Sequence, residues 1–113
     1  MTNGPIDLDV FNELKDATGD EFAAELVSIF LDEAPGMMAD LNSALAAGDA
    51  DGYRRAAHTL KSNATTFGAY SLAELARKIE LGDMPGDGDV TDANTLQTAL
   101  ETVRSALQEL IYD

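Results

Sequence analysis

Apolar residues recur along most of this chain every three to four positions, the spacing that places them on one face of an α-helix. No stretch alternates apolar and polar residues in the way that a half-buried strand does. The pattern therefore predicts an all-α chain. Helices are expected at about residues 8–17, over a long segment between a turn at 18–20 and Gly48, and at about 50–67, 69–81 and 90–111.

Residues that start, end or interrupt helices support these boundaries. Asp7 and Asp49 are expected to cap the helices that follow them, and Gly48 is expected to end the long segment. Pro35, followed by Gly36, is expected to break or kink that segment, because proline removes a backbone donor and clashes with the preceding turn.

The connections between these helices are short, apart from an acidic, glycine-rich loop at residues 82–89. Ser71 and Glu74 have the spacing of a capping box and mark an alternative start for the fourth helix. Long helices with short connections pack most simply as an antiparallel four-helix bundle. We therefore expect such a bundle, with the short additional N-terminal helix covering one end.

Length and composition are those of one folded domain, with 113 residues and 45% hydrophobic content. We expect a single free-standing domain over residues 1–113, with its core at about 6–112.

No apolar run approaches the ~20 residues that a membrane span needs, and no secretory signal is visible. The chain has no cysteine, which fits a reducing cytoplasm. A net charge of −14 argues against nucleic acid and anionic membranes as partners.

The positive charges are concentrated around the single histidine, His58. Residues 50–78 carry five cations against two carboxylates, a balance of +3, whereas the rest of the chain carries −17. Imidazole is a nucleophile and a proton acceptor near neutral pH, and neighbouring cations favour an anion placed on it. This cluster of cations in residues 50–78 therefore has two interpretations of equal weight. His58 carries a phosphoryl group, or it is an exposed histidine on a solvated face.

Helical spacing places His58 on the outer face of its helix. Each residue turns ~100° about the axis, so Leu60, Tyr53 and Phe67 fall about 180–220° away from the imidazole. These three are expected in the core, and His58 is expected to face water. Four residues that lie three or four positions away share its face: Arg54, Arg55, Lys61 and Ser62.

Metal and nucleotide chemistry find no support in the sequence. Di-iron helical bundles use Glu-x-x-His pairs, whereas Arg55 stands three positions before the only histidine. Zinc would lack nitrogen and sulfur ligands. No Walker-type phosphate loop and no glycine-rich kinase loop is present. We expect no metal site, no ATP site and no kinase activity.

The residues around the histidine resemble the signature of histidine-containing phosphotransfer (HPt) domains. In that pattern the phosphoacceptor histidine is followed by leucine two positions on, then lysine, then a small residue, with a glycine ten positions after the histidine. This chain has His58-Thr59-Leu60-Lys61-Ser62 and Gly68. The resemblance covers about residues 6–112 and departs from the family at Ser62, where glycine is common.

The resemblance implies a role for each matching residue. His58 would be phosphorylated on Nε2, and Lys61 would offset the phosphate charge. Ser62 would leave room for a partner's active site. Gly68 would let the next helix pack closely. Arg54, Arg55 and Thr65 are expected, with Ser62, on the partner-binding surface.

The resemblance also implies the function. The chain is expected to relay a phosphoryl group between receiver-domain aspartates in a multistep two-component phosphorelay, as a cytoplasmic monomer. Its expected partners are response-regulator receiver domains and a hybrid sensor histidine kinase. It would need no cofactor, because Mg²⁺ is expected on the receiver. Two alternatives remain: a helical module that binds receivers without carrying phosphate, and a phosphoacceptor fed directly by a kinase.

Overall fold

The computed structural model describes residues 5–86 and 89–112 of the chain. All secondary structure in these residues is helical, which confirms the predicted all-α class. The predicted loop at 82–89 is described except for residues 87–88. The helices are α1 (Leu8–Thr18), α2 (Asp20–Ala47), α3 (Ala50–Thr66), α4 (Tyr70–Leu81) and α5 (Thr91–Tyr112).

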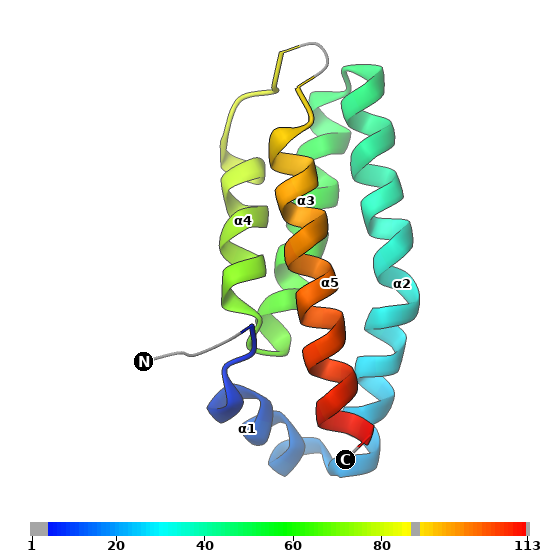
Figure 1. Ribbon diagram of the computed structural model, residues 1–113, viewed down its shortest axis with the longest axis vertical. Coiled ribbons are helices and arrows are strands. Elements are labelled where there is room, and N and C mark those ends of the chain that lie inside the picture. The colour runs from blue at the N-terminus through cyan, green and yellow to red at the C-terminus, as the bar shows by residue number, and fades with distance from the viewer. Residues whose placement is uncertain (1–4, 87–88, 113) are drawn as a thin grey trace.

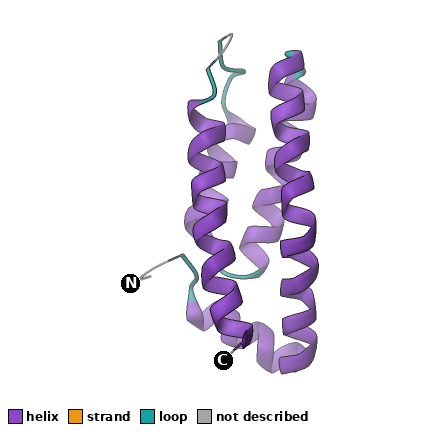
Figure 2. Ribbon diagram, turned by 45° about the vertical axis from the view of Figure 1, so that its right-hand side comes forward, coloured by secondary structure: helices purple, strands orange, loops and turns teal. Residues whose placement is uncertain are grey.

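The four long helices lie side by side along the long axis of the molecule, and α1 lies across one end (Figures 1 and 2). Helix α3 packs between α2 and α4, and α5 contacts both α4 and α2. Each long helix therefore has two neighbours, and the apolar faces of all four meet along one axis. None of the described helices is long and apolar enough to cross a membrane.

The core is a single cluster of buried apolar side chains contributed by every helix. Tyr53, Leu60 and Phe67 of the histidine-bearing segment are each at most 3% exposed, as the helical spacing predicts. The ring of Phe67 packs on that of Phe30 with centroids 5.4 Å apart. One face of α3 is thus fixed in the core, and this orientation turns the opposite face outward.

Side-chain caps set the start of two helices as predicted. Asp7 accepts a hydrogen bond from the Asp9 amide at the start of α1, and Asp49 accepts one from the Gly52 amide at the start of α3. Gly48 has a φ of 70° and ends α2 in the left-handed conformation. Helix α4 begins at Tyr70, so the alternative start at the capping-box spacing is not used.

Gly68 occupies a crowded turn between α3 and α4. Its φ is +78°, and its carbonyl accepts a 2.8 Å hydrogen bond from the Asp7 amide. A Cβ at this position would lie 2.9 Å from the Asp7 carbonyl oxygen and 3.0 Å from Cβ of Val10. The close neighbour of Gly68 is therefore the segment around the start of α1, whereas the sequence led us to expect the next helix.

Of the break or kink predicted at Pro35, the break does not occur: α2 is continuous from Asp20 to Ala47. Proline has no amide hydrogen, so the carbonyl of Leu31, four residues earlier, has no helical donor. Nη2 of Arg104 on α5 donates to this oxygen at 3.4 Å. The neighbouring helix thus compensates for the missing bond, which the local sequence of α2 does not reveal.

Candidate functional site

His58 lies on the outer face of α3, where 55% of its side-chain surface is exposed. The core residue Leu60 of the same helix is 1% exposed. The imidazole therefore has no part in the apolar core, and a reacting group can approach it from solvent.

A carboxylate from the neighbouring helix holds one side of the imidazole. Nδ1 of His58 lies 2.5 Å from Oε2 of Glu80 on α4. The other oxygen of that carboxylate, Oε1, accepts a hydrogen bond from Nζ of Lys61 at 2.5 Å. The side chain of Glu80 is only 19% exposed and that of Lys61 29%, so the contact between these two is partly shielded from water. Glu80 thus joins the two residues that the sequence motif singles out.

The hydrogen bond from Lys61 holds the pKa of Glu80 below its usual range, and the bond to His58 adds to this effect against the opposing influence of burial. Glu80 is therefore ionised at neutral pH and can only accept hydrogen bonds. The proton between the ring and the carboxylate must then belong to Nδ1. In the neutral ring this leaves the lone pair on Nε2, the nitrogen available as a nucleophile.

Sequence reasoning missed Glu80, although a usable signal was present. Gly68 lies in the turn between α3 and α4; His58 stands ten residues before it and Glu80 twelve residues after it. Helical residues rise ~1.5 Å each, so the two lie at nearly the same height in a helical hairpin. Counting outward from the glycine would have identified a carboxylate beside the histidine.

The two arginines that precede His58 on α3 have different environments. Nε and Nη2 of Arg54 each lie 3.4 Å from the carbonyl oxygen of Gly82, at the end of α4, and the side chain is half-buried. Arg55 is exposed and makes no ion pair with any described residue. Of these two, Arg55 is therefore the one whose guanidinium is more available to a partner.

The face of α3 beyond His58 is neutral and polar. Ser62 and Thr65 are both exposed. The hydroxyl of Thr65 donates to the carbonyl oxygen of Lys61 at 2.9 Å. The structure thus brings His58, Arg55, Ser62 and Thr65 to one surface, while Lys61 lies at the side facing α4.

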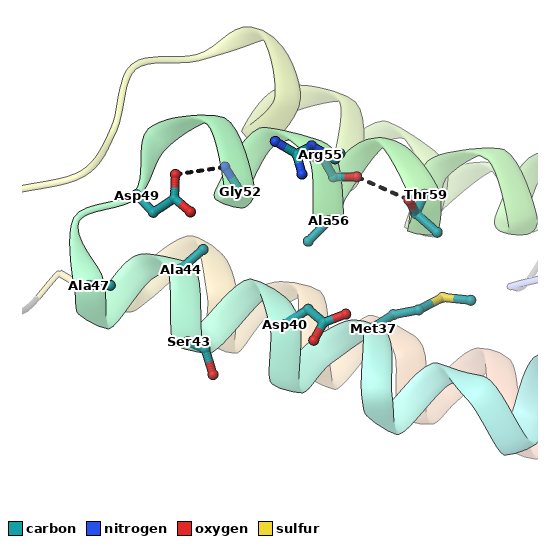
Figure 3. A pocket seen from close by; sticks show the side chains of 10 residues that line it. All are labelled: Met37, Asp40, Ser43, Ala44, Ala47, Asp49, Gly52, Arg55, Ala56 and Thr59. Carbon is teal, nitrogen blue, oxygen red and sulfur yellow. Dashed lines mark hydrogen bonds between the residues drawn. The ribbon is translucent and has the colours of Figure 1, made fainter.

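A shallow groove of about 460 Å³ runs between α2 and α3 next to this surface (Figure 3). Met37 and Asp40 line it from α2, and Arg55, Ala56 and Thr59 line it from α3. It is open and of mixed polarity, so it suits a side chain of a docked protein better than an enclosed small molecule.

Within the described parts of the chain, no group of three or more potential ligand side chains is placed to hold a metal ion. The chemistry that the site offers through its own residues is nucleophilic attack by an exposed imidazole whose second nitrogen is bound to a carboxylate.

Comparison with known proteins agrees with this geometry. A family model described as the Hpt domain matches residues 25–106. The match includes α3, α4 and therefore both His58 and Glu80. No curated protein and no solved structure matches the chain. The family resemblance inferred from the sequence is confirmed, and the chain belongs to the Hpt domain family, whose members carry phosphoryl groups on histidine in two-component signalling.

Proposed function

We propose that this chain accepts a phosphoryl group on Nε2 of His58 from an aspartyl phosphate in a receiver domain and passes it to the aspartate of another receiver. The observation that carries the proposal is the contact between Nδ1 of His58 and the ionised carboxylate of Glu80. It leaves the nucleophilic lone pair on Nε2 of an exposed ring.

The transfer step follows from this arrangement. The Nε2 lone pair forms a bond to phosphorus while the phosphorus–oxygen bond of the aspartyl phosphate breaks, and the electron pair leaves with the aspartate carboxylate. The Nδ1 proton stays where it is, so the ring gains a positive charge beside the Glu80 carboxylate. Attack by a second aspartate reverses these changes. Glu80 therefore acts by orienting the ring and by stabilising its charge.

Lys61 is proposed to offset phosphate charge, although its ammonium already bonds Glu80. An ammonium has three donors, so one bond to Glu80 leaves others for a phosphoryl oxygen. Mg²⁺, where transfer requires it, is proposed to come with the receiver. This chain would then need no cofactor of its own.

The proposed docking surface consists of His58, Arg55, Ser62 and Thr65, with the adjoining groove. The antiparallel four-helix bundle expected from the sequence fits this use, because neighbouring helices then form one continuous docking face. We further propose a monomeric cytoplasmic carrier that meets receivers and a hybrid sensor kinase through transient, modest interfaces.

Incubation with phosphorylated receivers tests the proposal. Label should enter the parent chain and resist base but not acid, as a phosphoramidate does, and His58→Gln should accept none while keeping its thermal midpoint. Label in His58→Gln would exclude His58 as the carrier. A parent that binds phosphorylated receivers without taking label would be a binding module, and one labelled only by a kinase with ATP would be a kinase-fed acceptor.

A further inference from the structure

The serine and threonine hydroxyls on α3 follow one pattern, from which Ser62 alone departs among the described residues of that helix. The hydroxyls of Thr59, Thr65 and Thr66 each donate to the carbonyl oxygen four residues earlier, at 3.1, 2.9 and 3.1 Å. Ser62 makes no such bond to the carbonyl of His58, and its hydroxyl has no hydrogen-bond partner among residues 5–86 and 89–112. Ser62 is exposed, so its hydroxyl remains free to donate outward.

The orientation of the imidazole decides which side of it a phosphoryl group occupies. Glu80 and Lys61 lie on the α4 side, where the Glu80 carboxylate holds Nδ1 and Lys61 holds the other oxygen of that carboxylate. Nε2 is across the ring from Nδ1 and therefore points away from Glu80. By helical rotation Ser62 lies about 40° from His58, on the opposite side from Lys61 at about 60°.

Along the axis of α3, the side chain of Ser62 also lies level with a phosphoryl group on His58. Residues four apart on a helix have Cβ atoms ~5–6 Å from each other, and side chains lean toward the N-terminus of the helix. The side chain of Ser62 consequently leans back toward the turn that carries His58. A phosphoryl group has three oxygens that accept hydrogen bonds, and a serine hydroxyl is a suitable donor to them.

We propose that the hydroxyl of Ser62 donates a hydrogen bond to the phosphoryl group on Nε2 of His58 and so shifts the transfer equilibrium toward the phosphorylated form of this chain. The inference rests on the proposed function. It concerns the position where the family commonly has glycine, which offers no hydroxyl. The bond exists only when His58 is phosphorylated, so it stabilises that state over the unphosphorylated one.

The equilibrium between this chain and one receiver provides the test. A phosphorylated receiver is mixed with parent, Ser62→Ala or Ser62→Gly, and the final ratio of phosphohistidine to phosphoaspartate is measured. Because an exposed hydrogen bond to a charged group contributes modestly, both variants should lower this ratio by about three- to tenfold. Thr66→Val removes a neighbouring hydroxyl already bonded to the helix and should leave the ratio unchanged.

The alternative is that Ser62 only restricts access to the ring. A purely steric effect changes forward and reverse rates by the same factor, so it leaves the ratio unaltered. Equal ratios for parent and Ser62→Ala would overturn the inference, even if Ser62→Gly changed the ratio, because Ser62→Ala already lacks the hydroxyl. If the parent itself takes no label from any receiver, the proposed function fails, and that result is distinct from either outcome.

Discussion

Nδ1 of His58 and Oε2 of Glu80 lie 2.5 Å apart, although the two residues belong to different helices and stand 22 positions apart in the sequence. The contact fixes the ring's rotation and places a negative charge beside the nitrogen that keeps its proton. The effects of this contact on the phosphotransfer rate and on stability can be measured separately.

Glu80→Gln should slow phosphotransfer without unfolding the chain. The amide can still accept a hydrogen bond from Nδ1, but it no longer stabilises the positive charge that forms on the ring. A charge-assisted hydrogen bond exceeds a neutral one by about 1–1.5 kcal/mol, so the single-turnover rate from a phosphorylated receiver should fall about tenfold. Glu74→Gln alters an exposed carboxylate on the same helix and serves as the control. An unchanged rate in Glu80→Gln would remove the electrostatic role.

The same carboxylate should make stability depend on pH in a defined direction. The pKa of Glu80 is lowered in the folded chain, so its contribution is fully present above the ordinary glutamate pKa of about 4.3. It is lost as the pH falls through the lower native value, because protonation abolishes the bonds to Lys61 and His58. The difference in unfolding free energy between parent and Glu80→Gln, from urea titrations at pH 5 and at pH 3, should therefore shrink at pH 3. A difference that grows on acidification would contradict the lowered pKa.

Lys61→Ala should reduce transfer without abolishing it. The variant loses the cation proposed to offset phosphate charge and also the hydrogen bond that contributes most to the lowered pKa of Glu80. A partly exposed contact of this kind is worth about 1–2 kcal/mol after solvent screening, on the order of tenfold in rate. Lys61→Arg should recover part of the loss because the charge is kept. Lys78→Ala, whose side chain is 69% exposed, is the matched control and should transfer at the parental rate.

Substitution of Arg54 should affect the stability of the fold, whereas substitution of Arg55 should affect docking to the receiver. Arg54→Ala removes the donors to the Gly82 carbonyl and should lower the free energy of unfolding by about 1 kcal/mol. Arg55→Ala removes an exposed cation and should raise the receiver concentration needed for half-maximal transfer, with a weaker salt dependence and an unchanged thermal midpoint. If both variants behave alike in the two assays, the division of roles inferred from their contacts is wrong.

Gly68→Ala should destabilise the chain by about 1–3 kcal/mol, measured by thermal or urea unfolding. An L-residue at a φ of +78° is strained, and the added Cβ meets the Asp7 carbonyl oxygen. Gly36 is the matched control, because it lies inside α2 with nothing near an added Cβ. Gly36→Ala should stabilise by up to about 1 kcal/mol. A Gly68→Ala variant as stable as the parent would show that the turn adjusts freely.

Local signals in the sequence were sufficient for most of the helix boundaries and for the outward direction of His58, since capping residues and helical periodicity act over a few positions. The partners of the histidine depend on how α3 and α4 align, which single-helix patterns do not encode. For that reason Glu80 was missed. The same limitation explains why Arg54 and Arg55 looked equivalent, because their difference comes from where the end of α4 lies.

The hydrogen bond from Arg104 to the Leu31 carbonyl has a consequence for synthesis. The donor lies 73 positions after the acceptor, so the ribosome completes α2 long before α5 exists. During that interval Arg104 cannot yet donate to the Leu31 carbonyl, and this oxygen is left to bond water. This turn should become protected only when the last helix docks, even though its own residues are made in the first third of the chain.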